Sequence, residues 1–166
     1  MFVDKRAPGL AIVLVLLLAD ITWAGQKRHA TPLGANDFRV GRIDDRMSSA
    51  QIRAALGPPL SVESARNFVD PDSPVITWHY DELLVFFVTE DSILGIELTG
   101  KKWETARGLH VGDSEAKVKR LYGNPTSTYS QDWDYVDQSD GTDLHVVRVT
   151  LEGGRVRTIF IGTLLD

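Results

Sequence analysis

Cysteine is absent from this chain of 166 residues, which excludes disulfide bonds, a catalytic thiol and lipidation through a cysteine. Basic residues are scattered, and 18 Lys and Arg against 23 Asp and Glu give a net charge of -5. Without a sustained basic block, a nucleic-acid duplex or an anionic membrane surface is not expected as the main partner. The 43% hydrophobic and 25% charged content is that of a globular protein with one ordinary domain or two small ones.

Only one long apolar run is present, at residues 9–19, and it follows Lys5 and Arg6. Residues 22–24, Thr-Trp-Ala, then provide a small-x-small cleavage motif. This order of charge, apolar run and cleavage motif predicts a secretory signal peptide over residues 1–24.

An uncleaved signal anchor is the alternative interpretation of the same segment. Asp20 ends the apolar run well short of the roughly 20 residues that a membrane-spanning helix requires. We therefore expect an exported protein, periplasmic or extracellular, with no stable membrane anchor after cleavage. Residues 25–41 carry few large apolar side chains and are expected to form a flexible lead-in.

The remainder of the chain contains an internal repeat. A shift of 66 positions aligns serine with serine, glycine with glycine and proline with proline: Ser48 with Ser114, Gly57 with Gly123, and Pro59 with Pro125. This spacing predicts two repeats, one over residues 42–100 and one over residues 101–166.

Each repeat opens with the signals of a short helix. Ser48 and Gln51 form a capping-box pattern at the first helix, Ser114 is the equivalent cap of the second, and Gly57 and Gly123 stand where a helix ends. Apolar segments bounded by turn residues then predict strands at 75–80, 83–89 and 93–99, and at 132–137, 144–151 and 156–161. The expected fold class is α+β: two tandem repeats, each a short helix or helical pair plus a three- to four-stranded antiparallel meander.

The second repeat resembles a known family. The carrying motifs are residues 111–114 (Val-Gly-Asp-Ser), 122–125 (Tyr-Gly-Asn-Pro), Trp133-x-Tyr135, and Val147-x-Val149-x-Leu151. They are similar to the SmpA/OmlA domain of the outer-membrane assembly lipoprotein BamE, and the tandem arrangement resembles the β-lactamase-inhibitor-protein fold. The resemblance implies non-enzymatic binding of another protein in the envelope or outside the cell. The chain lacks the lipidated cysteine of BamE and the disulfides of the inhibitor proteins.

A Trp-x-Tyr motif occurs in both repeats, as Trp78 with Tyr80 and Trp133 with Tyr135. Alternate residues of a strand share one face, so each pair lies on one side of its strand. Exposed pairs would be anchors for a protein partner, with an acidic rim at Asp137 and Asp140, and inward pairs would be core. The binding interpretation therefore assigns the protein-binding site to six residues: Trp78, Tyr80, Trp133, Tyr135, Asp137 and Asp140.

Residues 83–88 are apolar at every position, whereas a strand with one wet face should alternate with polar residues. Both faces of this strand are therefore expected to be covered, by the helix and the other repeat or by an external partner.

Catalytic and metal signals are weak. A small metal-dependent hydrolase would use His79, Asp81 and His145, but these residues lack the spacing of a zinc motif. The acidic stretch at 132–143 does not fit a calcium-binding EF-hand loop, and a solvated hairpin explains it better. We expect no cofactor, no metal site and no enzymatic activity.

The sequence thus favours an exported module that binds another envelope or secreted protein through a sheet face. The hydrolase and a purely structural envelope component are the alternatives. The sequence leaves open the identity of the partner and the oligomeric state.

Overall fold

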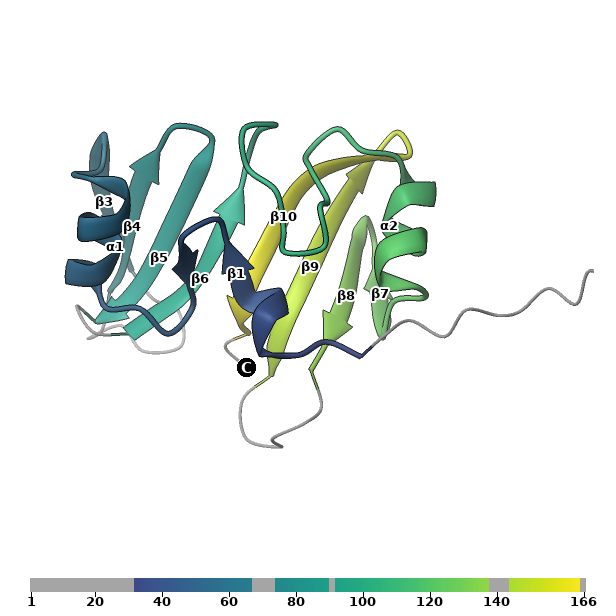
Figure 1. The fold of residues 1–166 in the computed structure, drawn as a ribbon, viewed down its shortest axis with the longest axis horizontal. Helices are drawn as coiled ribbons and strands as arrows, with labels where there is room; N and C mark the ends of the chain where they lie inside the picture. Colours follow the sequence, from purple (N-terminus) through teal and green to yellow (C-terminus); the bar gives the residue numbers. More distant parts are fainter. Residues whose placement is uncertain (1–31, 67–73, 90–91, 138–143, 165–166) are drawn as a thin grey trace, which may run out of the picture.

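The computed structural model describes residues 32–66, 74–89, 92–137 and 144–164 (Figure 1). The segment 1–24, expected to be a signal peptide, lies outside these residues. The elements are the 3-10 helix η1 (Ala35–Phe38), helices α1 (Ser49–Leu56) and α2 (Glu115–Tyr122), and strands β1 (Arg39–Val40), β2 (Ile43–Asp44), β3 (Ser61–Ala65), β4 (Val75–Tyr80), β5 (Leu83–Thr89), β6 (Ser92–Leu98), β7 (Ser127–Tyr129), β8 (Asp132–Val136), β9 (His145–Glu152) and β10 (Arg155–Thr163).

The expected α+β arrangement of two helix-plus-meander repeats is wrong. The described chain is mostly strand, with one eight-stranded sheet in the order β3-β4-β5-β6-β10-β9-β8-β7, a two-stranded sheet of β1 and β2, and two α-helices. The decisive contact is the antiparallel pairing of β6 with β10, which sets Leu98 opposite Ile159 and Gly95 opposite Gly162. This pairing makes one sheet and one continuous core from segments 42–100 and 101–166.

The predicted helix ends are confirmed. The Ser48 hydroxyl accepts a hydrogen bond from the Gln51 N–H at 3.4 Å, and the Gln51 side chain accepts one from the Ser48 N–H at 2.8 Å. The Ser114 hydroxyl accepts from the Lys117 N–H at 3.3 Å in the same way. Gly57 and Gly123 end the helices with φ of 84° and 77°, a conformation that favours glycine.

The strands predicted from apolar segments are also present; two have the predicted bounds, and the other four differ by one or two residues at an end. Strands β3 and β7, at the two edges of the sheet, were not predicted. Every residue of both strands is exposed, so neither shows the alternation that identifies a half-buried strand.

The segment expected to be a flexible lead-in, 25–41, packs on the sheet over its described part. Phe38 and Val40 are buried in the core at 3% and 0% exposure. The carboxylate of Asp37 accepts hydrogen bonds from the Arg107 guanidinium at 2.6 and 2.8 Å. Few large apolar residues are therefore sufficient here, because an ion pair and two buried side chains hold the segment.

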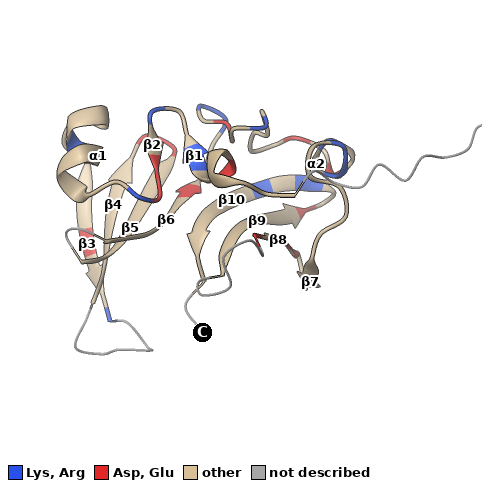
Figure 2. Ribbon diagram, turned by 60° about the horizontal axis from the view of Figure 1, so that its bottom comes forward, with Lys and Arg blue, Asp and Glu red and all other residues tan. Residues whose placement is uncertain are grey.

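The two α-helices and the segment of η1 and β1 lie on one side of the sheet. Figure 2 shows α1, the β1 and η1 segment, and α2 together above the strands. The buried side chains of the central strands point toward them: Leu83, Val85, Phe87, Ile96, Leu98, Val147, Val149, Ile159 and Ile161. We call this the helix side of the sheet, and the opposite side the open face.

Candidate functional site

The Trp-x-Tyr pairs lie on the helix side and not on an exposed surface. Trp78 is 7% exposed and Tyr135 is 4% exposed, and both belong to the core. Tyr80 and Trp133 are half-buried and pack against it. The structure therefore selects the core alternative for Trp78 and Tyr135, because the helices dock on the strand face that these residues share.

Each helix places a cation over the tryptophan below it. The Arg53 guanidinium of α1 lies 4.8 Å from the centre of the Trp78 ring, and the Lys119 ammonium of α2 lies 4.9 Å from that of Trp133. Contacts of this kind add to the apolar packing of a helix on a sheet. They give the tryptophans a structural role beneath α1 and α2.

The two tyrosine hydroxyls hold the ends of the same helices. Tyr80 Oη donates to the carbonyl of Gly57 at 3.2 Å, and Tyr135 Oη donates to that of Gly123 at 3.3 Å. Burial raises the pKa of both tyrosines above the ordinary value. The hydroxyls therefore stay protonated and act as donors to helix-terminal carbonyls.

The expected acidic rim is described only in part. Asp137 follows β8, is half-buried, and its backbone N–H donates to the carbonyl of His145 at 2.9 Å. Asp140 lies outside the described residues. The six residues of the predicted site therefore do not form one exposed surface.

The structure does not bring the residues of the hydrolase alternative together. His79 adjoins Trp78 in β4 and so points to the open face, where its Nε2 lies 3.3 Å from Glu63 Oε2. His145 lies on the helix side, with its Nδ1 3.1 Å from Asp45 Oδ2. Asp81 pairs with Lys102 at 2.8 Å.

Metal-ligating groups are likewise dispersed. Among residues 32–66, 74–89, 92–137 and 144–164, no three His, Asp or Glu side chains converge as a metal ion requires.

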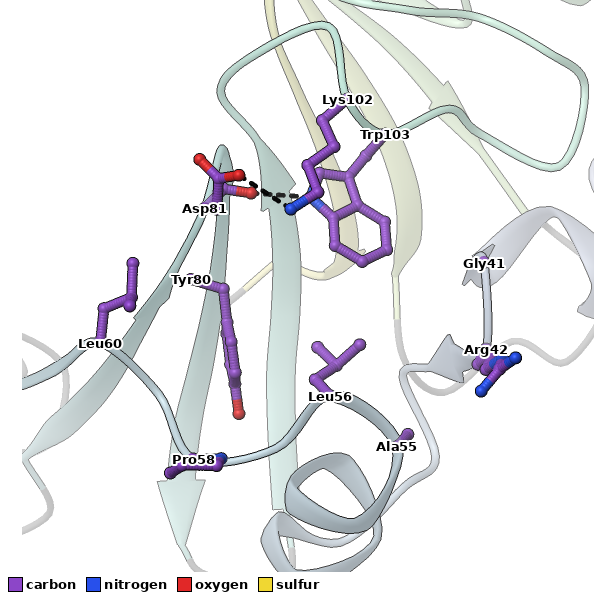
Figure 3. Close-up of a pocket in the computed structure, with 10 residues that line it drawn as sticks. All are labelled: Gly41, Arg42, Ala55, Leu56, Pro58, Leu60, Tyr80, Asp81, Lys102 and Trp103. Atoms are coloured by element: carbon purple, nitrogen blue, oxygen red, sulfur yellow. Dashed lines mark hydrogen bonds and ion pairs between the residues drawn. The ribbon is translucent and has the colours of Figure 1, made fainter.

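A cavity of about 580 Å³ opens beside the end of α1 (Figure 3). Its walls are mainly apolar, and its lining residues are Gly41, Arg42, Ala55, Leu56, Pro58, Leu60, Tyr80, Asp81, Lys102 and Trp103. Most of its polar groups already have partners in the chain: Trp103 Nε1 donates to the Asp81 carbonyl at 2.9 Å, and Lys102 pairs with the Asp81 carboxylate. We call it the α1 groove; it offers shape and apolar contact without a converging polar group.

The open face of the sheet is a second candidate surface. Leu84, Phe86 and Val88 of β5 project to it and are half-buried, whereas the alternate residues of the strand are buried on the helix side. No element among the described residues covers this side in Figure 2. One row of side chains crosses it from strand to strand: Ser61, His79, Leu84, Glu97, Phe160, Arg148, Asp134 and Ser127.

Two glycines shape the centre of the open face. Gly95 of β6 faces Gly162 of β10, and a Cβ on Gly95 would overlap the Phe160 ring. The Phe160 ring therefore lies across Gly95, where no larger residue fits, and its centre is 6.2 Å from that of Phe86. This contact creates an aromatic patch over the central strands.

A cavity of about 320 Å³ adjoins the aromatic patch, and we call it the Glu97 cavity. Glu97 stands directly opposite Phe160 and forms no ion pair with any described residue. Desolvation by burial raises the pKa of Glu97, while a hydrogen bond with the Thr158 side chain opposes the rise. The remaining lining residues are Leu94, Arg148, Thr150, Thr163 and Leu164.

The arginine of this cavity is already neutralised. Arg148 Nε and Nη2 donate to the two carboxylate oxygens of Asp134 at 2.7 and 2.9 Å, and these hydrogen bonds raise the pKa of Arg148. Asp132 accepts from the Thr150 hydroxyl at 2.7 Å. Glu97 is therefore the carboxylate of this cavity that has no cationic partner among the described side chains.

Sequence reasoning identified part of the open face and missed the rest. The apolar run 83–88 indicated a strand with two covered faces, and three of its residues form the apolar part of this surface. Glu97 and Phe160 gave no signal, because they become neighbours only through the β6 and β10 pairing.

No helix among the described residues is long and apolar enough to cross a membrane. The chain matches no protein-family model, no curated protein and no solved structure.

Proposed function

We propose that this protein is an exported, non-enzymatic module that binds another protein on the open face of its sheet. The observation that carries the proposal is the placement of Leu84, Phe86 and Val88, which are apolar and partly exposed on a face that no described element covers. Apolar and aromatic side chains at the centre of a surface, with polar groups around them, are characteristic of protein interfaces.

The surroundings of this patch favour a specific partner over general stickiness. The open face carries Glu63, Glu97, Asp132 and Asp134, with Arg148 near its centre. Such a field steers a basic partner toward the face and raises the association rate more than the affinity. Export is supported by the pattern of residues 1–24, and the resemblance to the SmpA/OmlA domain points to envelope proteins as the class of partner.

A catalytic alternative receives no support from side-chain placement, because His79 and His145 project to opposite sides of the sheet. The α1 groove is the competing binding surface, and the test separates the two.

The test is affinity capture from envelope and secreted fractions with three immobilised full-length proteins: wild type, Phe86→Ser and Leu60→Ser. Leu60 is the matched control because it is 77% exposed in the α1 groove. We expect one protein to be enriched by wild type and Leu60→Ser and lost with Phe86→Ser. Retention by Phe86→Ser with loss in Leu60→Ser would assign binding to the α1 groove, and the absence of any specific capture would contradict the proposal.

A further inference from the structure

The Glu97 cavity has the chemistry of a receptor for one side chain. It combines a carboxylate, an aromatic ring and apolar walls within about 320 Å³. Glu97 and Phe160 are direct cross-strand neighbours and line the same cavity, so a group that contacts the carboxylate lies within reach of the ring. Leu94 and Leu164 supply the apolar lining.

The charges around the cavity select the sign of that side chain. Arg148 is held by Asp134 through two short hydrogen bonds, whereas Glu97 has only a neutral hydroxyl, that of Thr158, as a partner. The other polar lining residues, Thr150 and Thr163, are neutral. A cation entering here would neutralise Glu97 and lie beside an aromatic ring, two favourable interactions at once.

We propose that the Glu97 cavity receives a lysine or arginine side chain of the partner protein, with its charged head on Glu97 and its alkyl stem along Phe160. This inference rests on the proposed function, since it names the chemistry of a partner that docks on the open face. It makes Glu97 the specificity-determining residue of the interface, while Phe86 and Leu84 supply apolar contact.

The direction of the Glu97 pKa agrees with this role. Burial without a cationic partner raises the pKa, so the carboxylate is poorly solvated in the free protein. A bound cation stabilises the charged form and lowers the pKa again. A fall in the pKa of Glu97 on binding therefore reports contact with the bound cation, because no Lys, Arg or His among the described residues pairs with Glu97.

The test uses small probes and needs no partner protein. Butylguanidinium carries the head and stem of an arginine, butylurea has nearly the same shape without charge, and butyrate carries the opposite charge. Each is titrated into the full-length protein while the side-chain carboxyl carbon of Glu97 is followed by NMR. We expect saturable binding of butylguanidinium, about tenfold tighter than butylurea, with a lowered Glu97 pKa.

Two variants complete the experiment. Glu97→Gln should remove the preference for the cation, and Glu63→Gln, on the exposed edge of the same face, should retain it. Where Glu97→Gln does not fold, Phe160→Leu takes its place and should weaken butylguanidinium more than butylurea. Equal binding of both probes, tighter binding of butyrate, or no saturable shift would overturn the cation site.

The outcome is distinguishable from failure of the proposed function. If the cavity binds butylguanidinium selectively but no protein is captured, the cation site is supported and protein docking on the open face is contradicted. If a protein is captured through the open face but the cavity binds butylguanidinium and butylurea equally, docking is supported and the role of Glu97 as a cation receptor is contradicted.

Discussion

Phe86 and Phe87 are adjacent in β5 but point to opposite sides of the sheet. Phe87 is 1% exposed and contacts the Trp78 ring at a centroid distance of 4.8 Å, while Phe86 is half-buried on the open face. They form a matched pair, because the same Phe→Ala substitution at neighbouring positions removes the same atoms from two environments.

The expected magnitudes follow from this difference in burial. Phe87→Ala opens a cavity in the core between α1 and the sheet, which lowers the free energy of unfolding by about 3–5 kcal/mol. Phe86→Ala removes a side chain that is only partly withdrawn from water, and its cost is about 1–2 kcal/mol.

Urea unfolding of the full-length variants, followed by far-UV circular dichroism, measures both values. If the free energy of unfolding falls with urea concentration at the same slope in both variants and in the wild type, their unfolded states are comparable. A Phe86→Ala cost as large as that of Phe87→Ala would refute the reasoning, since it would mean that the open face is covered within this chain. A small cost at Phe87 with a large one at Phe86 would indicate the opposite register of β5.

Three further predictions concern single interactions. Asp37→Asn leaves the largely buried Arg107 without its carboxylate and should lower the free energy of unfolding by about 3 kcal/mol in urea titrations; a loss near zero would mean that the pair is dispensable. Tyr135→Phe removes the hydrogen bond to Gly123 and should cost about 1 kcal/mol in the same assay, whereas unchanged stability would assign Tyr135 to packing alone. Desolvation raises the pKa of Glu97 in the folded state above its ordinary value of 4.5, so the folded state binds the Glu97 proton more tightly than the unfolded state does. The free energy of unfolding should therefore fall as the pH rises from the unfolded-state pKa of Glu97 to its folded-state pKa. Glu97→Gln should lose this part of the slope, and a wild-type slope in that variant would contradict the assignment.

The elements with strong local signals were predictable. Ser48, Gln51 and Gly57 specify where α1 begins and ends through contacts within four residues, and the structure has those hydrogen bonds. The central strands followed from apolar segments of the right length between turn residues. Strands β3 and β7 did not, because exposed edge strands have no buried side to produce a pattern.

The position of the Trp-x-Tyr motifs required the tertiary structure. Period-two alternation places Trp78 and Tyr80 on one side of β4 but does not say which side is covered. Docking of α1 over Trp78, with Arg53 above the ring and the Tyr80 hydroxyl on Gly57, decided that this side is core.

By itself, the sequence determined where the capped helices and the central strands form, and which residues share a strand face, because these depend on neighbours along the chain. The tertiary structure alone decided that the strands join in one sheet and that Glu97 meets Phe160. Residues 97 and 160 are distant in sequence, and their contact depends on the pairing of β6 with β10, for which the chain carries no local signal.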